Sequence, residues 1–203
     1  YYQADKPITE QTEALGHAVR AAYFYAGAAD VARLTGDSDL LASCERLWRN
    51  IVDRKLYITG GIGATHMGEA FSFDYDLPND TAYSESCAAI ALAFFARRML
   101  EIQPKSEYAD VMESALYNTT LAGMALDGKS FFYVNPLEVV PEACQAGAPE
   151  VVRMRLLPAE HRTHRGGRAA VRLHDRRRLI HPVCASVYGR RRPCQAFRHR
   201  CAP

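Results

Sequence analysis

The sequence predicts a mainly α-helical domain with one short β-hairpin, followed by an irregular tail. Apolar residues recur every three or four positions in four segments before residue 123, as they do on one face of a helix. An Asp-Gly pair at 127–128 stands between two apolar runs, which is typical of a hairpin turn. Beyond residue 145 neither the helical nor the strand period is present.

Two helices are expected before the first long loop. Residues 12–35 carry apolar side chains at helical spacing, and Gly36 follows as a stop signal. Asp37 or Ser38 can cap the second helix. The expected buried faces consist of Leu15, Val19, Ala22, Ala26 and Ala29 in the first helix, and of Leu40, Leu41, Cys44, Trp48, Ile51 and Val52 in the second.

A long loop separates these helices from a second pair. Residues 57–79 contain four Gly and one Pro and have no helical period, and loops of this length are usually functional. A third helix is expected from Asp80 or Thr81 to about residue 100, and a fourth over residues 107–122. Helix pairs joined by loops indicate a helical-hairpin architecture rather than a parallel sheet.

The net charge of +2 averages two unlike parts. The tail, residues 146–203, holds 14 Arg, no Lys and three acidic residues, a net charge of +11. The body, residues 1–145, carries 11 basic and 20 acidic residues, a net charge of −9. An Arg-rich and Lys-free composition is typical of translated GC-rich DNA, so we expect the tail to be disordered and to bind no nucleic acid.

The composition also limits the class of protein. No apolar run approaches the roughly 18 residues that span a membrane, so no membrane partner is expected. The six Cys form no CxxC pair and no dense disulfide framework, which indicates a reduced, cytoplasmic protein. The chain does not begin with Met, which suggests a fragment.

Five residues are candidates for chemistry, and each also has a plain structural interpretation. Glu69, close to two Phe in the loop, is a candidate general acid or else a solvated loop carboxylate. Glu85 and Cys87 suit zinc, but positions i and i+2 of a regular helix point apart. Cys87 on spacing alone is a core residue, and His17 and Tyr133 are either substrate contacts or structural residues.

Four runs of the sequence resemble glycoside hydrolase family 127, the β-L-arabinofuranosidases. They are ITGGIGATHMGEAFSFDYDLPNDTAYSESCA, FFARRML, YADVMESALYNTTLAGMALDG and FFYVNPLEV, and the resemblance covers residues 1 to about 143. It implies part of an (α/α)6 barrel of the six-hairpin glycosidase type. It also implies a retaining exo-glycosidase that acts on an arabinofuranoside sugar with a zinc-bound cysteine nucleophile.

The resemblance gives each candidate a role. Glu69 of HMGEAF matches the general acid/base, and Glu85 and Cys87 of SESCA match two of the four zinc ligands. His17 of EALGHAVR and Tyr133 of FFYVNP match residues that contact the sugar. Glu69 would protonate the leaving oxygen and then deprotonate the water that resolves the glycosyl-cysteine.

The other half of the implied zinc site is missing. The family supplies two more zinc ligands, one of them the nucleophile, from a Cys-Cys pair in a run like QKWFGCACCPPNIA, and this chain has no adjacent Cys pair. Codons chosen for Glu150–Arg162 and translated one base later give KWFGCACCPPNI. We therefore predict a frame shift between about Val140 and Pro149, an out-of-frame tail, an incomplete zinc site and an inactive fragment.

Two alternatives remain open at this point. The basic tail could belong to a nucleic-acid- or zinc-binding module without catalysis, since its charge would favour phosphates. The helical domain could instead serve a sugar epimerase or lyase, although Glu85 and Cys87 argue against this because those reactions need no zinc-thiolate site.

Overall fold

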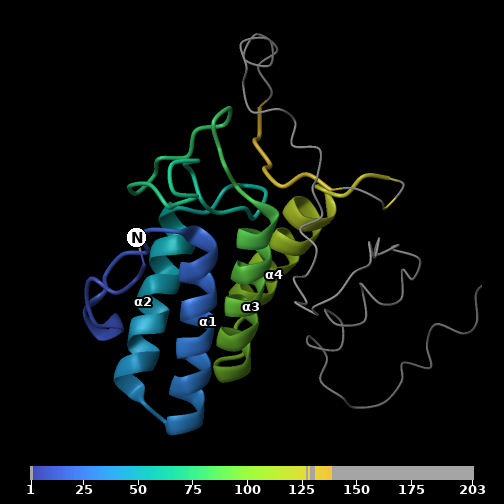
Figure 1. Ribbon diagram of the computed structural model, residues 1–203. Coiled ribbons are helices and arrows are strands. Elements are labelled where there is room, and N and C mark those ends of the chain that lie inside the picture. Colours follow the sequence, from blue (N-terminus) through green and yellow to red (C-terminus); the bar gives the residue numbers. More distant parts are fainter. Residues whose placement is uncertain (1, 127, 129–130, 139–203) are drawn as a thin grey trace, which may run out of the picture. The chain divides into compact units, whose positions relative to one another are not determined.

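The computed structural model describes residues 2–126, 128 and 131–138. They form the helices α1 (Ala18–Thr35), α2 (Ser38–Arg54), α3 (Ser86–Ile102) and α4 (Ser106–Ser114). A 3-10 turn, η1 (Ile8–Glu10), precedes them, and a π-helix, η2 (Ala115–Leu121), follows (Figure 1). The mainly helical prediction is confirmed, whereas the tail of residues 146–203 and the predicted frame shift lie outside the described residues.

Helix α1 packs against both α2 and α3. Seven of its eight buried residues are Ala, so the neighbouring backbones can approach closely. The ring of Trp48 on α2 meets Phe95 of α3 and Tyr108 of α4 edge-on, with centroids 5.4 Å and 5.0 Å apart. This aromatic group joins the helices into one core.

The predicted boundary between the first two helices is confirmed. Gly36 ends α1 in the left-handed conformation, at φ 71°. Asp37 caps α2, because its Oδ1 accepts hydrogen bonds from the N–H groups of Asp39 and Leu40 at 3.0 and 2.9 Å. Local chemistry alone determines this turn, which is why the sequence predicted it well.

The predicted start of the first helix is wrong. α1 begins at Ala18, because the preceding segment uses its polar groups elsewhere: the Ala14 N–H donates to Asn50 Oδ1 at 2.8 Å, and Gly16 has a φ of 74°. Leu15 is 47% exposed and lies outside the buried face.

The predicted start of the third helix is wrong as well. α3 begins at Ser86, because the Tyr83 and Ser84 N–H groups donate to the carbonyls of Ala64 and Gly63 at 3.4 and 2.8 Å. These non-local bonds hold residues 83–84 beside the long loop. Local sequence signals do not reveal bonds of this kind.

The predicted fourth helix and the hairpin are present in modified form. The helix is α4 continued by η2, with wider π turns from Ala115 onward. Within residues 2–126, 128 and 131–138 the structure forms isolated bridges and no strand. The expected hairpin therefore appears as one antiparallel bridge between Met124 and Phe131. Among the described residues, no helix is both long and apolar enough to cross a membrane.

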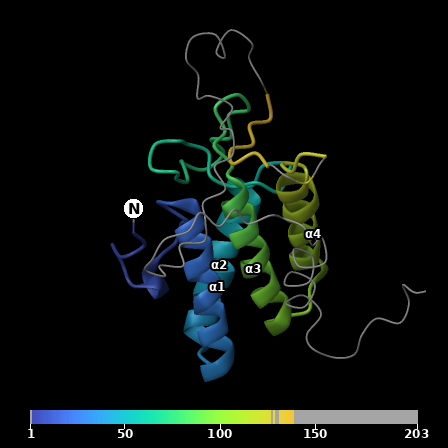
Figure 2. The same ribbon diagram turned by 45° about the vertical axis from the view of Figure 1, so that its right-hand side comes forward.

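The segment between α2 and α3 gathers at the end of the helices where α1 and α3 begin (Figures 1 and 2). Its glycines allow close packing. A Cβ on Gly60 would lie 2.5 Å from the backbone nitrogen of Ala115, and Gly60 has a φ of 79°. A Cβ on Gly61 would lie 2.0 Å from Ser84 Oγ. Thr119 of η2 also donates to the Thr59 carbonyl at 2.6 Å, so the loop is anchored to the helices.

Gly60→Ala is expected to lower the free energy of unfolding by about 2 kcal/mol or more, because a side chain there meets backbone atoms and a strained φ. Gly27→Ala is the matched control, since nothing lies within 4 Å of its Cβ position in α1. It should raise stability by about 0.5–1 kcal/mol. Urea unfolding followed by circular dichroism measures both, and a Gly60→Ala variant as stable as the parent would contradict this packing.

Candidate functional site

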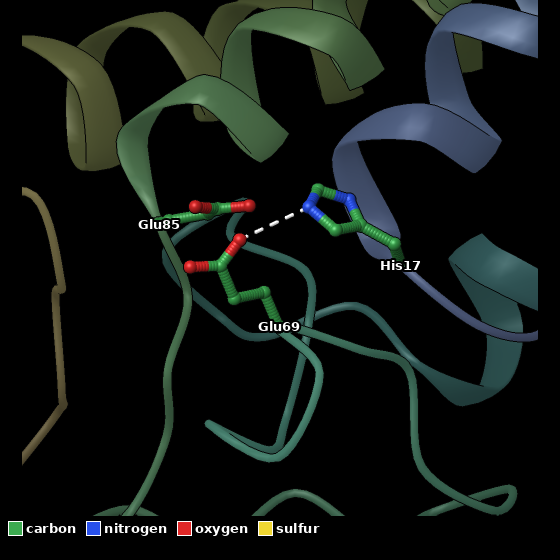
Figure 3. A group of neighbouring side chains, drawn as sticks. All are labelled: His17, Glu69 and Glu85. Carbon is green, nitrogen blue, oxygen red and sulfur yellow. Dashed lines mark hydrogen bonds and ion pairs between the residues drawn. The ribbon is translucent and has the colours of Figure 1, made fainter. Parts of the chain in front are cut away.

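The predicted site residues His17, Glu69 and Glu85 come together where α1 and α3 begin (Figure 3). One side-chain nitrogen or oxygen of each lies within 4.8 Å of those of the other two. His17 stands at the start of α1, Glu85 at the start of α3, and Glu69 in the loop between α2 and α3. Residues separated by up to 68 positions therefore share one site.

Hydrogen bonds at both ring nitrogens orient His17. Its Nδ1 accepts from the Arg20 N–H at 3.3 Å and so caps α1. A neutral imidazole whose Nδ1 accepts carries its proton on Nε2. Nε2 therefore donates to Glu69 Oε2, 3.0 Å away.

Backbone pairing holds Glu69 opposite His17. The Ala18 N–H donates to the Glu69 carbonyl at 3.0 Å, and the Phe71 N–H donates to the Gly16 carbonyl at 2.9 Å. Glu69 itself has a φ of 51°, in the left-handed region that few non-glycine residues adopt. The surrounding bonds keep this conformation, which directs the side chain toward His17.

Tyr83 holds the second oxygen of Glu69. Its hydroxyl donates to Glu69 Oε1 at 2.9 Å. Burial, and then this bond to Glu69, raises the pKa of Tyr83 above its ordinary value. Sequence reasoning missed Tyr83, because nothing in its spacing distinguishes it from an ordinary tyrosine just before a helix.

Glu85 is the buried acidic residue of this group. The residue is 1% exposed, and neither oxygen has a hydrogen-bond partner among the described residues. Burial raises the pKa of Glu85, and the charge of Glu69 raises it further. Tyr133 and Cys87 lie near enough to lower that pKa in part, although neither meets the geometry of a hydrogen bond to the carboxylate.

Cys87 and Tyr133 form the other side of the site. The Cys87 thiol lies 3.7 Å from the Tyr133 hydroxyl. Burial and the neighbouring Glu85 raise the pKa of Cys87 to about 12. Tyr133 is positioned by its carbonyl, which accepts from the Ser86 N–H at 2.9 Å. All five predicted residues therefore lie in or beside one cluster.

The start of α3 removes the geometric objection to Glu85 and Cys87 acting together. Glu85 occupies the cap position with extended backbone, at φ −71° and ψ 147°, so it lies outside the regular helix. The rule that positions i and i+2 point apart applies only within a helix. Both side chains therefore influence Tyr133, whose pKa is raised by burial and by these two neighbours.

The donor set fits a cation at Glu85 and Cys87 better than one at His17. A histidine that binds a metal needs a free lone pair on the ring nitrogen that faces the ion, and it usually donates a hydrogen bond through its other nitrogen. In His17 the arrangement is reversed, because Nδ1 accepts and Nε2 donates. The two unpartnered oxygens of Glu85, beside a thiol, are the groups that a cation would satisfy.

The comparisons with known proteins agree on one family. The model of the β-L-arabinofuranosidase family, GH127 catalytic domain, matches residues 1–156. A non-reducing end β-L-arabinofuranosidase from Bifidobacterium longum subsp. longum is 53% identical over 142 residues. That match covers 70% of this chain and 22% of the relative, so the chain spans about a fifth of the curated protein's length.

Two solved structures are similar as well. Ara127N, a GH127 β-L-arabinofuranosidase from Geobacillus stearothermophilus T6, is 56% identical with a TM-score of 0.72 over 75% of this chain and 24% of its own. A second GH127 β-arabinofuranosidase, BT3674, is 54% identical with a TM-score of 0.66 over 68% of this chain and 22% of its own.

Glu85→Gln is expected to lower the pKa of Cys87, because it removes a negative charge that opposes ionisation of the thiol. Iodoacetamide should then alkylate Cys87 several-fold faster at pH 8 in the presence of a chelator, as measured by peptide mass spectrometry. Cys44, whose pKa burial and Glu45 raise to about 11, is the internal control and should not change. Unchanged or slower alkylation of Cys87 would contradict the proposed influence of Glu85.

Proposed function

Because the chain belongs to glycoside hydrolase family 127, the β-L-arabinofuranosidase family, we propose that it derives from a retaining exo-β-L-arabinofuranosidase. Its helices would form part of an (α/α)6 catalytic barrel, and its substrate class would be β-linked L-arabinofuranosides. One observation supports this most directly: Glu69 is held between His17 and Tyr83, beside the buried Glu85, whose oxygens have no hydrogen-bond partner in the described part of the chain.

We propose Glu85 and Cys87 as two ligands of a zinc ion. A carboxylate and a thiolate are both ordinary zinc ligands. When bound, zinc lowers the pKa of a coordinated thiol, so that the thiolate predominates at neutral pH. The orphaned oxygens of Glu85 support this assignment, because a buried carboxylate without a partner is otherwise costly.

The hydrogen bonds of Glu69 indicate where its proton would move. His17 Nε2 only donates while Nδ1 caps α1, so Glu69 Oε2 stays an acceptor. The Tyr83 hydroxyl can donate or accept a hydrogen bond. It can therefore stay hydrogen-bonded to Oε1 whether or not Oε1 carries a proton. We infer that Oε1 gives its proton to the departing glycosidic oxygen and later takes one from water.

Tyr133 and His17 border this proton-transfer group. Tyr133 lies edge-on to Tyr83, with ring centroids 6.1 Å apart, and His17 contacts Glu69 directly. Groups in these positions could donate hydrogen bonds to sugar hydroxyls or accept hydrogen bonds from them. We propose them as sugar contacts, in agreement with the roles that the family resemblance implies.

The residue that would attack the sugar is missing from this chain. The sequence has no adjacent Cys pair, and codons chosen for Glu150–Arg162 encode such a pair only when they are translated one base later. Glu69 alone can move a proton but cannot form the covalent intermediate of a retaining glycosidase. We therefore propose that this polypeptide keeps the acid/base and half of the zinc site and has no hydrolytic activity.

The purified chain is expected to release no L-arabinose from a β-L-arabinofuranosyl substrate. A gene that continues over the full length of the relatives, and from which one base near codon 145 is removed, should encode the Cys-Cys run and gain measurable release. Glu69→Gln in that corrected gene is the control for authentic catalysis and should reduce the rate by about 100-fold or more. Release of arabinose by the unmodified chain would refute the proposed inactivity.

The coding DNA should show a lost or gained base between codons 140 and 149. In that case the bases after the shift, translated in the other frame, will continue the family sequence beyond residue 150 of this chain. An open frame without such a change would contradict the frame-shift hypothesis while leaving the site geometry untouched.

A further inference from the structure

The C-terminal end of α2 contacts both segments that carry the acid/base pair. Lys55, the cap residue of α2, has a side chain that is only 3% exposed. Its Nζ donates to Glu13 Oε1 and to the Ser72 carbonyl, each at 2.6 Å. Glu13 precedes His17 by four positions, and Ser72 follows Glu69 by three.

Asn50, five positions before Lys55 on α2, bridges the same two segments. Its Oδ1 accepts from the Ala14 N–H at 2.8 Å, and its Nδ2 donates to Asp74 Oδ1 at 3.0 Å. Arg54 donates to the other oxygen of Asp74 at 2.5 Å. Asn50 and Lys55, near the end of α2, therefore hold residues 13–14 on one side and residues 72–74 on the other.

The two held segments lead directly into the pairing at the site. Residues 16–18 and 69–71 are joined by the Ala18 N–H to Glu69 carbonyl bond at 3.0 Å and the Phe71 N–H to Gly16 carbonyl bond at 2.9 Å. The His17 to Glu69 side-chain bond lies within this short ladder. A shift of either segment relative to α2 would change the separation of the two side chains.

A buried lysine is a poor choice for stability alone. Removing an ammonium from water carries a penalty that its ion pairs often fail to offset, and an apolar residue of similar size is frequently as stable. The same group is well suited to fixing geometry, because its bonds to Glu13 and Ser72 form only when both segments are in place. The contacts of Lys55 therefore favour a positioning role over simple packing.

We propose that Lys55, assisted by Asn50, is a positioning residue that sets the hydrogen bond between His17 and Glu69. We call the contacts of Lys55 and Asn50 with residues 13–14 and 72–74 the clamp. The clamp is a property of the fold, and only its consequence for acid/base chemistry rests on the proposed function. Its test therefore uses the hydrogen bond itself, which can be observed whether or not the chain hydrolyses any sugar.

The test is nuclear magnetic resonance of the histidine ring protons in the full chain labelled with nitrogen-15. The parent should show a downfield Nε2 proton that is absent from His17→Gln. In Lys55→Met, which removes the charge but keeps an unbranched side chain, that signal should disappear or its proton should exchange with water roughly tenfold faster. An unchanged signal in folded Lys55→Met would overturn the proposal.

Two further variants separate positioning from general destabilisation. Met99→Ala truncates a fully buried residue of the helical core and should lower stability while leaving the His17 signal in place. Glu13→Gln removes one charge from a side chain that is 36% exposed, so it should fold even if Lys55→Met does not. It should shift the His17 signal in the same direction by a smaller amount. The proposed role of Lys55 would be contradicted if the His17 signal were lost in Met99→Ala. It would also be contradicted if the signal did not shift in Glu13→Gln.

Discussion

The pairing of residues 16–18 with residues 69–71 is the contact on which the site depends. Two backbone hydrogen bonds of 3.0 and 2.9 Å join a segment before α1 to a loop more than fifty residues later. They place the imidazole of His17 against the carboxylate of Glu69 and hold Glu69 at its unusual positive φ. The helices hold the two paired segments. Residues 16–18 lead into the start of α1, and the end of α2 contacts residues 13–14 and 72–74 beside the pairing.

The parts of the fold that local chemistry determines could be predicted from the sequence. Gly36 and Asp37 mark the turn between α1 and α2 because a left-handed glycine and a capping carboxylate act within a few residues. The starts of α1 and α3 could not be predicted. Gly16 takes a positive φ of 74° just before α1, and the carbonyls of Gly63 and Ala64 accept the N–H groups of Ser84 and Tyr83 just before α3.

The candidate site also contains features that the sequence could predict and features that depend on long-range contacts. Glu69, Glu85 and Cys87 could be singled out because carboxylates and a thiol are concentrated near a glycine-rich loop, and family resemblance supplied their roles. The contact of Tyr83 with Glu69, and the direction of the hydrogen bond from His17, depend on long-range packing that no spacing rule encodes. The extended backbone at Glu85 places this residue outside the regular helix, so the rule for positions i and i+2 does not apply to it.

The order of these contacts along the chain has a consequence for synthesis on the ribosome. The side-chain and backbone hydrogen-bond partners of Glu69 described above, and Asn50 and Lys55, which hold its loop, lie between residues 17 and 83. Domains generally form from the N-terminal side as the chain emerges. The contacts of Glu69 with His17 and Tyr83 can thus form before residue 133 is translated. A change in the coding sequence after residue 83 would therefore leave these contacts of Glu69 in place.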